Sequence, residues 1–288
     1  MTPLIDADIL LHELGWSGQF KDKDTGEEVI LDFERVKDML DEKIRLICAD
    51  VEATEDPILF VTDSEEIVRR TNKLRQWQGL PLVTFTPNFR YEVAKTKPYK
   101  GTRKNPKPFH FYNILFYLMA EYDVRVSEGG LEADDMVCIE QCRSDKDTII
   151  CSRDKDLRIC PGWHFSWECG GQRSLGPTET DEFGWLEMHE KKDKKGKVVD
   201  RKVLGYGLSF FYYQMLVGDS ADNIPGLPKW GPAKAFSLLG GLESKEETLQ
   251  AVKSLYKETM GKKSKEYFLE QGNLLWMIQK EGQNFDIT

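Results

Sequence analysis

The chain has 288 residues, of which 40% are hydrophobic, and it carries a formal net charge of −9 at pH 7. This length allows one large α/β core with a helical extension or two domains, and the composition is typical of a globular protein. No apolar run approaches the roughly 18 residues of a membrane span, and the N-terminus lacks the basic and apolar regions of a signal peptide, so we expect a cytoplasmic protein that does not bind membranes.

The six cysteines do not form a recognisable disulfide framework or zinc site. They include no CxxC pair, and the chain has only four histidines. Cys138 and Cys142, four residues apart, fit one face of a buried helix better than half of a zinc site. We therefore predict reduced core cysteines at Cys48, Cys138, Cys142, Cys151, Cys160 and Cys169.

The charges are unevenly distributed along the chain. Residues 90–107 carry seven Lys or Arg and one acid, and residues 191–202 carry seven and two. The acidic total therefore does not exclude a nucleic-acid partner, because local charge matters more than the sum. The second stretch, with a predicted turn near Lys195 and Gly196, is either a solvated surface ribbon or a contact for a nucleic-acid backbone.

Strands and helices are predicted to alternate. A strand ending at Asp6 precedes helices up to about residue 53, and a strand at residues 57–62 places Asp63 at its end. Later predicted elements are an extended segment at 80–90, a basic mobile arch at 91–108, an apolar helix at 109–122, a strand at 124–127, a helix from 131, a strand at 147–152, a hairpin around Gly170 and Gly171, and helices from Leu208 onward.

This alternation predicts an α/β fold with a mostly parallel central sheet flanked by helices. In such folds, sites lie beyond the carboxyl ends of the strands. We predict a core over residues 1–205, with the arch at about 88–108, and a helical region over residues 206–288.

Acidic residues cluster where the predicted strands end or the predicted helices begin. Carboxylates gathered in one pocket repel each other, so such a pocket makes physical sense mainly around divalent cations. Taken singly, EADD at 132–135 is explained equally by helix capping, and SRDKD at 152–156 and GDSADNIPG at 218–226 by polar loops. The candidates are Asp6, Asp8, Asp63, Glu132, Asp134, Asp135, Asp154, Asp156, Asp219 and Asp222.

In this order, LIDAD at 4–8 and the three motifs above resemble the metal-ligand motifs of the 5′-nuclease superfamily, which includes flap endonucleases and bacteriophage 5′–3′ exonucleases. The resemblance spans residue 4 to about residue 240. It implies a PIN-like nuclease core that hydrolyses DNA phosphodiesters with two or more Mg²⁺ ions, for which Mn²⁺ would substitute.

The resemblance also implies which residues bind each metal. The first metal would be held by Asp6, Glu132, Asp134 and Asp135. The second would be held, directly or through water, by Asp154, Asp156, Asp219 and Asp222. Asp135 and Asp154 would be central to catalysis, whereas Asp8 is a weaker candidate that also fits a helix cap.

PYKGTRK at 98–104 resembles the arch motif of the family. By this resemblance, Tyr99 would stack on a base, Lys100 would neutralise the reacting phosphate and Arg103 would bind a neighbouring one. Arg90 and Lys104 are further predicted DNA contacts. The simpler alternative is a basic surface loop.

The segment before this motif departs from the family pattern. A family aspartate usually lies shortly before an NFR-like segment, whereas here Asp63 and NFR at 88–90 are more than twenty residues apart. Two alignments are open. Asp63 is a ligand followed by an insertion, or that ligand is missing and Asp63 is only a strand-end residue.

Residues 223–240 resemble the helix-hairpin-helix element with which the family binds duplex backbone. Gly226 and Gly231 would let backbone N–H groups approach a phosphate, and Lys234 would supply charge. Residues 227–231 replace the usual glycine-isoleucine-glycine hairpin. This change weakens the expectation of a bound monovalent ion more than that of duplex contact.

The predicted activity is that of a 5′–3′ exonuclease or 5′ flap endonuclease. It would act as a monomer on DNA with a 5′ end, nick or flap, alongside replication or recombination proteins, and in the host cytoplasm if a phage encodes it. One alternative is a PIN-like ribonuclease, which would lack the helix-hairpin-helix. The other is a non-catalytic DNA-binding protein, which the retention of at least seven candidate ligands argues against.

Overall fold

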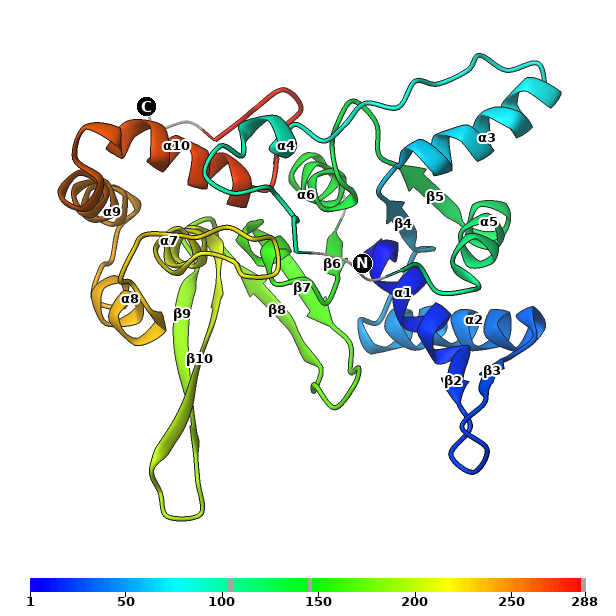
Figure 1. Ribbon diagram of the computed structural model, residues 1–288, viewed down its shortest axis with the longest axis horizontal. Coiled ribbons are helices and arrows are strands. Elements are labelled where there is room, and N and C mark those ends of the chain that lie inside the picture. The colour runs from blue at the N-terminus through cyan, green and yellow to red at the C-terminus, as the bar shows by residue number, and fades with distance from the viewer. Residues whose placement is uncertain (103–105, 145–146, 286–288) are drawn as a thin grey trace. The chain divides into compact units, whose positions relative to one another are not determined.

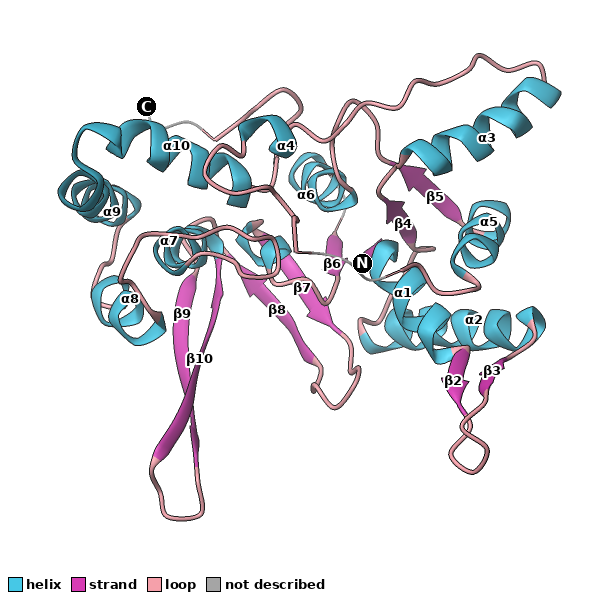
Figure 2. Cartoon of the chain, in the orientation of Figure 1, coloured by secondary structure: helices cyan, strands magenta, loops and turns pink. Residues whose placement is uncertain are grey.

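The computed structural model (Figure 1) describes residues 1–102, 106–144 and 147–285. The predicted DNA contacts Arg103 and Lys104 lie outside the described residues. Strands and helices alternate up to residue 180, and helices dominate after Tyr206 (Figure 2).

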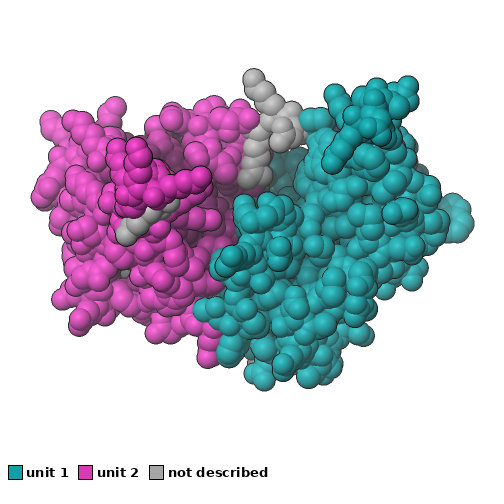
Figure 3. Space-filling view, turned by 90° about the horizontal axis from the view of Figure 1, so that it is seen from below, with its two compact units in different colours: residues 1–88, 104–153, 163–178 teal, residues 89–103, 154–162, 179–288 magenta. Residues whose placement is uncertain are grey.

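The chain forms two compact units (Figure 3). Unit 1 consists of Met1–Asn88, Lys104–Arg153 and Trp163–Thr178. Unit 2 consists of Phe89–Arg103, Asp154–Gly162 and Glu179–Thr288. The division therefore differs from the predicted boundary near residue 205, because two short segments and the ribbon that precedes residue 206 join the C-terminal helices.

A six-stranded sheet lies in unit 1, apart from the terminal residues of its last two strands. Its order is β5-β4-β1-β6-β7-β8, and the pairs from β5 to β7 are all parallel. This confirms the predicted mostly parallel sheet. The strands are β1 (Thr2–Asp6), β4 (Ile58–Val61), β5 (Asp123–Val126), β6 (Thr148–Cys151), β7 (Gly162–Ser166) and β8 (Leu175–Thr180).

Helices flank this sheet in unit 1. They are α1 (Ala7–Ser17), α2 (Phe33–Asp50), α3 (Glu65–Trp77), α5 (Phe111–Glu121) and α6 (Ala133–Arg143), and a small hairpin of β2 (Gln19–Lys21) and β3 (Glu28–Ile30) follows α1. The helix α2 illustrates why they form. Its apolar residues recur at helical spacing on one buried face, and the side chain of Asp32 accepts a hydrogen bond from the Arg35 amide at its start.

The two faces of the sheet have different neighbours. Ile5 and Leu59 belong to the large apolar core that includes residues of α1, α2 and α5. Because successive strand residues point to opposite faces, Leu4, Phe60 and Asp6 face the other side. The helix α6 contacts β1, β4 and β6. The strand period therefore directs Asp6 away from the large apolar core.

Unit 2 is mainly helical. It contains α4 (Arg90–Val93), the 3₁₀ helix η1 (Asp156–Ile159), β9 (Trp185–Lys192), β10 (Val198–Tyr206), α7 (Gly207–Val217), α8 (Pro232–Leu239), α9 (Lys245–Met260), the 3₁₀ helix η2 (Gly261–Lys263) and α10 (Ser264–Leu275). The helix α7 is buried along nearly its whole length and contacts α8, α9, α10, η1 and both strands. It is the central element of this unit.

The strands β9 and β10 form an antiparallel ribbon, visible as the long two-stranded element in Figure 1. Its turn is closed by the amide of Gly196, which donates to the carbonyl of Asp193 at 3.0 Å. This confirms the predicted turn near Lys195 and Gly196, and of the two predicted forms, a loop or a ribbon, the structure has the ribbon.

The segment between Asp63 and the arch differs from expectation. The helix α3 occupies residues 65–77, and the predicted extended segment at 80–90 forms no strand. Its apolar residues Leu80 and Leu82 are exposed. The short apolar run indicated a strand, but no neighbouring strand pairs with it in the part of the chain that the structure describes.

Two further expectations concern membranes and cysteines. None of the helices in the described ranges is long and apolar enough to cross a membrane. None of the six cysteines, all of which are described, forms a disulfide, as predicted. Cys142 is nevertheless exposed, so not every cysteine is a core residue.

Candidate functional site

The acidic residues predicted to hold the first metal all lie in unit 1, and those predicted to hold the second all lie in unit 2. Each group is built by a different set of elements. The unit 1 group consists of Asp6, Glu132, Asp134 and Asp135, and the unit 2 group consists of Asp154, Asp156, Asp219 and Asp222.

A hydrogen bond to the Thr62 side chain places the start of α6 at the carboxyl ends of β1 and β4. Asp6 is the register partner of Phe60, and Thr62 follows directly after β4. The hydroxyl Oγ1 of Thr62 accepts a hydrogen bond from the Ala133 amide at 2.8 Å. The acidic first turn of α6 therefore lies at the sheet edge where Asp6 ends its strand.

Asp8 contributes to this arrangement as a structural residue. Its Oδ1 accepts a hydrogen bond from the Thr62 amide at 3.1 Å, which ties α1 to the end of β4. Asp8 thus fixes Thr62, whose hydroxyl accepts the hydrogen bond from the start of α6. This agrees with its being the weaker ligand candidate.

Three carboxylates of the unit 1 group are buried. Asp6, Glu132 and Asp135 are 2%, 6% and 0% exposed. The Ser152 hydroxyl donates to Asp6 Oδ2 at 2.9 Å, and Asp135 Oδ2 accepts from the Glu132 amide at 3.1 Å. Helix capping is therefore part of the role of Asp135. Burying several negatively charged carboxylates at one edge of the sheet costs free energy unless a cation neutralises their charge. Carboxylate oxygens are hard ligands, which suit Mg²⁺.

Asp134 differs from its neighbours in being only half-buried. Successive residues of a helix point in directions about 100° apart, so Asp134 and Asp135 cannot share one face. Asp134 therefore fits the group less closely than Asp135 does.

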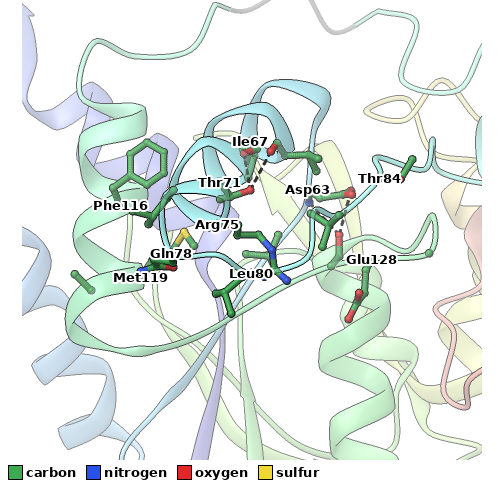
Figure 4. Close-up of a pocket in the computed structure, with 17 residues that line it drawn as sticks. Asp63, Ile67, Thr71, Arg75, Gln78, Leu80, Thr84, Phe116, Met119 and Glu128 are labelled. Carbon is green, nitrogen blue, oxygen red and sulfur yellow. Dashed lines mark hydrogen bonds between the residues drawn. The ribbon is translucent and has the colours of Figure 1, made fainter.

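Asp63 lies in a separate pocket. Its amide and its Oδ1 are hydrogen-bonded to the hydroxyl of Ser127, at 2.9 and 3.4 Å. The pocket has a volume of about 730 Å³ and apolar walls from α3, α5 and the end of β5. Figure 4 shows Asp63 on its wall, with Phe116 and Met119 across it.

Burial raises the pKa of Asp63 to about 6, and the charge of Glu128 acts in the same direction against the hydrogen bond from Ser127. Asp6, Glu132, Asp134 and Asp135 are not among the causes of this shift. The placement favours the second alignment, in which Asp63 is a strand-end residue rather than a metal ligand.

The unit 2 group begins immediately after the chain leaves unit 1. The Asp156 amide donates to Asp154 Oδ1 at 2.9 Å, which closes a turn between the two carboxylates. Between them, Lys155 pairs through Nζ with Asp156 Oδ1 at 2.8 Å and with Asp219 Oδ2. The sequence pattern indicated two carboxylates on one pocket, and it did not indicate that the intervening lysine joins them.

The loop that carries Asp219 is closed by two glycines. Gly218 has φ +76° and Gly226 has φ +65°, and a Cβ on either would overlap the backbone of the opposite strand of the loop. The amide of Asp219 donates to the Ile224 carbonyl at 2.8 Å, and that of Ile224 returns a bond at 2.7 Å. The Asp219 side chain itself accepts from the Ala221 amide at 2.8 Å. This geometry holds Asp219 in a fixed direction.

Gln214 is a member of the unit 2 group that the sequence did not reveal. It lies on α7, is 2% exposed and donates from Nε2 to Asp156 Oδ1. Its Oε1 is buried with no hydrogen-bond partner among the described residues. An oxygen without a partner, on a side chain that contacts the Asp156 carboxylate, fits a bound cation or its water shell. A glutamine in an apolar helix gave no motif, so only its position in α7, five residues before Asp219, hinted at this role.

The pKa values of the two buried aspartates, Asp156 and Asp219, are shifted in opposite directions. Burial raises the pKa of Asp156 to about 7, and the charges of Asp154 and Asp219 act with it against Lys155. Burial also opposes ionisation of Asp219, but the ammonium of Lys155 keeps the pKa of Asp219 below its ordinary value. The same two carboxylates outweigh burial and raise the pKa of Lys155. Lys155 is therefore a permanent cation here.

The arch motif is attached to the Asp219 loop within unit 2. The Lys100 amide donates to the Asp222 carbonyl at 3.0 Å, and Asn223 Nδ2 donates to the Pro98 carbonyl at 2.9 Å. Lys100 has φ +52° and its Nζ lies 5.0 Å from the centre of the Tyr99 ring. The structure thus fixes the backbone of Lys100 to the loop that carries Asp219.

Three predicted DNA contacts are placed differently from expectation. Arg90 is 0% exposed and donates to the carbonyls of Leu274 and Trp276, at 3.3 and 2.6 Å, where it caps α10. Tyr99 is 3% exposed, so its ring is covered rather than presented for stacking. The Gly226 amide donates to Gln271 at 3.0 Å and its carbonyl accepts from a tyrosine hydroxyl. Burial has assigned all three to the fold of unit 2.

Gly231 and Lys234 are exposed at the start of α8, where the predicted duplex contact would lie. Lys234 Nζ lies 4.0 Å from the centre of the Trp230 ring. Within residues 223–240 the structure has one helix, α8, and α7 precedes this range. The helix-hairpin-helix therefore stays a prediction.

Among the described residues, no three His, Cys, Asp or Glu side chains converge closely enough to hold a metal ion as they stand. In unit 2, the ammonium of Lys155 lies between two of the predicted ligands. The donor chemistry of both groups nevertheless suits a hard divalent ion, because all the candidate atoms are oxygens.

No protein-family model matches the chain. Among solved structures, the chain is similar to the bacteriophage T5 D15 protein co-crystallized with metal ions, at 14% identity and a TM-score of 0.46, over 95% of this chain and 93% of that one. It is also similar to a mutant of the T5 5′-exonuclease, at 14% identity and 0.43, over 95% and 92% of the two chains. A third similar structure is the catalytic core of Rad2 in complex with a DNA substrate, at 11% identity and 0.42, over 92% and 68%.

Proposed function

We propose that this protein is a divalent-metal-dependent 5′-nuclease that hydrolyses phosphodiesters near the 5′ end, nick or flap of a DNA strand. The observation that supports it best is the sorting of the predicted ligands into two groups by the fold. Asp6, Glu132 and Asp135 are buried at one sheet edge of unit 1. In unit 2, Asp156 and Asp219 both pair with the ammonium of Lys155.

The acidic residues would act by holding Mg²⁺ or Mn²⁺. Bound ions of this kind activate a water and neutralise the oxygens of a scissile phosphate. Asp6 and Asp135 would hold one ion in unit 1, with Ser152 orienting Asp6. Asp156 and Asp219 would hold another in unit 2, with the Ala221 amide orienting Asp219 and Gln214 orienting Asp156.

Lys100 would supply positive charge to the reacting phosphate. Its backbone is fixed to the carbonyl of Asp222, so its side chain starts from a defined point beside the acidic loop. A cation that meets charge developing in the transition state increases turnover more than binding. Lys100→Ala should therefore lower kcat more than it lowers duplex affinity.

The test uses end-labelled blunt, nicked and 5′-flapped duplexes, incubated with Mg²⁺ or with EDTA. Wild-type protein should cleave near the 5′ end only with the ion. Asp135→Asn and Asp154→Asn should each reduce cleavage by about a hundredfold or more while DNA binding persists. Asp22→Asn is the matched control, because Asp22 also accepts turn amides but lies in the exposed β2–β3 hairpin.

The outcomes separate the rival functions. Preference for an RNA strand would favour the PIN-like ribonuclease, and duplex binding without metal-dependent cleavage would favour a non-catalytic DNA-binding protein. Unchanged cleavage by Asp135→Asn in Mg²⁺ would refute the assignment. The ratio of blunt-end to flap cleavage decides between an exonuclease and a flap endonuclease. We further propose that the protein acts in phage DNA replication or recombination.

A further inference from the structure

Lys155 belongs to the SRDKD motif, but neither the predicted ligand set nor the proposed reaction uses it. Its Nζ lies 2.8 Å from Asp156 Oδ1 and also pairs with Asp219 Oδ2. The two aspartates are 7% and 4% exposed and are 63 residues apart in sequence. Lys155 therefore bridges two buried carboxylates, and no other ion pair among the described residues neutralises them.

The position of this ammonium coincides with that expected of a metal ion. Two carboxylates that share a buried site repel each other, and a cation between them removes that repulsion. A lysine ammonium is a compact point charge, so it can occupy the place between two carboxylate oxygens. The oxygens it contacts are those of two predicted ligands of the second metal.

The geometry around Lys155 also allows it to leave. Its backbone is helical, with φ −70° and ψ −24°, directly before η1. The four-carbon stem is flexible and its side chain is partly exposed, so the ammonium can move to solvent without a change of backbone. Asp156 and Asp219 would stay in place, because Gln214 and the Ala221 amide hold them independently.

We propose that Lys155 is a built-in cation, which keeps the unit 2 acidic group assembled before a divalent ion binds and which the ion displaces from Asp156 and Asp219. The inference rests on the proposed function, because the displacing ion is the divalent ion that the proposed nuclease would bind. Lys155 is thus a positioning residue, and it weakens ion binding while it stabilises the ion-free protein.

The direct test measures Mn²⁺ binding by calorimetry in Lys155→Met. Glu132→Gln serves as a common background, so that the titration reports the unit 2 group. Without the competing ammonium, Mn²⁺ affinity should rise by about tenfold, the equivalent of one charge-assisted hydrogen bond. The thermal midpoint in EDTA should fall and should recover with Mn²⁺.

Lys245→Met is the matched control. Lys245 also belongs to unit 2 and pairs with an acid, Glu182, but it does not contact the acidic group. Its removal should leave Mn²⁺ affinity unchanged. Equal Mn²⁺ affinity in Lys155→Met and Lys245→Met would overturn the proposal.

A second measurement uses wild-type protein and so does not depend on the folding of a variant. Lys155 is acetylated with an amine-reactive reagent, with and without Mn²⁺, and the modification is quantified by peptide mass spectrometry. Displacement by the ion should increase acetylation of Lys155 several-fold, with Lys245 as internal reference. Acetylation of Lys155 that does not respond to Mn²⁺ would contradict the proposal.

The two proposals fail in different ways. If wild-type protein cleaves DNA but Lys155 responds to ions in neither measurement, the built-in cation is refuted and the nuclease stands. If Mn²⁺ binds more tightly to Lys155→Met but no substrate is cleaved, the nuclease is refuted and the built-in cation stands.

Discussion

At the scale of single residues, burial decides the role of each charged side chain. Asp6 and Asp63 both follow parallel strands, yet Asp6 bonds to Ser152 at the start of the acidic group and Asp63 turns into an apolar pocket. Arg90 carries the charge expected of a DNA contact, yet it is fully buried. Asp6 and Asp63 share a residue type and a place at the end of a strand, and Arg90 has the residue type of a DNA contact. The contacts that each side chain makes in the folded protein decide its role.

The raised pKa of Asp63 predicts a pH-dependent stability. Because the folded-state pKa, about 6, exceeds the ordinary value of 3.8, the folded protein binds the proton more tightly. The contribution is therefore favourable at pH 4 and is lost as pH rises through 6. Asp63→Asn should stabilise the protein at pH 8 by about 1 kcal/mol, allowing for partial exposure, and have little effect at pH 4.

Urea unfolding at both pH values checks this prediction. Asp22→Asn is an opposite-sign control, because turn amides lower the pKa of Asp22 and its substitution should destabilise at pH 8. The same Asp63→Asn protein should retain nuclease activity. Loss of cleavage with intact folding would instead support Asp63 as a ligand.

Arg90 should behave as a stability residue. Its guanidinium donates to two carbonyls at the end of α10, and removing it leaves both buried acceptors without their charged donor. Arg90→Ala should lower the free energy of unfolding by about 3 kcal/mol. Arg90→Lys should rescue only part of this, since one ammonium lacks the guanidinium fork.

Denaturant unfolding and DNA titration of the folded protein measure the two effects separately. Lys234→Ala is the contrasting variant, because Lys234 is exposed on α8. It should weaken duplex binding without changing stability. A selective loss of DNA affinity in Arg90→Lys, with normal stability, would argue for the phosphate contact predicted from the sequence.

At the scale of elements, the acidic groups depend on how loops are closed and helices begin. The α6 start is held by a hydrogen bond to Thr62, and the Asp219 loop is closed by Gly218 and Gly226 in positive φ. Both glycines were conspicuous in GDSADNIPG, but the interpretation of Gly226 as a phosphate contact was wrong about its surroundings. Its amide is used inside the unit, so its function is to close the loop.

Gly218→Ala should disrupt this loop. The substitution forces φ +76° on a residue with a Cβ and places that Cβ against the Ile224 carbonyl. We expect a loss of about 1–3 kcal/mol in unfolding free energy and weaker Mn²⁺ binding, because Asp219 follows directly.

Gly231→Ala is the control for this variant. Gly231 has φ −114°, and a Cβ there would meet open space. Because Gly231 is the N-cap of α8 and Ala is a poorer N-cap than Gly, the substitution should lower stability by about 0.5–1 kcal/mol and leave Mn²⁺ binding unchanged. Thermal denaturation and Mn²⁺ calorimetry of both variants check the comparison, and equal effects would show that loop closure at Gly218 is not the cause.

At the scale of the whole molecule, each unit carries one acidic group, and both contain buried carboxylates. The charge of such groups disfavours the folded state unless it is neutralised, so ions that bind only the folded protein should stabilise it. In unit 1 the Ser152 hydroxyl and the Glu132 amide donate hydrogen bonds to buried carboxylates, and in unit 2 Lys155 pairs with Asp156 and Asp219.

Mg²⁺ should raise the thermal midpoint, and more so at high pH. At a concentration of 100 times the dissociation constant, an ion adds about 2.7 kcal/mol of stability. Because the pKa of Asp156 is about 7, protons compete with the ion below this pH. The Mg²⁺-induced shift should therefore grow between pH 6 and pH 8.

Differential scanning calorimetry with Mg²⁺ or EDTA measures this shift. Asp135→Asn with Asp219→Asn should abolish it, and Asp22→Asn should not. A Mg²⁺ shift that is the same at pH 6 and pH 8 would contradict the role of Asp156.

The sequence by itself determined the α/β alternation, the parallel sheet and the acidic residues at its strand ends. These follow from apolar periodicity and local spacing, which are properties of neighbouring residues in the chain. The turn near Gly196 was predictable for the same reason, whereas the sequence left open whether a loop or a ribbon carries it.

Only the tertiary structure decided which charged residues are buried and what they contact. The pocket around Asp63, the helix cap made by Arg90, the hydrogen bond from Gln214 to Asp156 and the bridge made by Lys155 join residues that are distant in sequence. Packing across the fold decides these contacts, because desolvation and hydrogen bonding between distant segments determine which side chains meet. A local sequence motif therefore does not predict them.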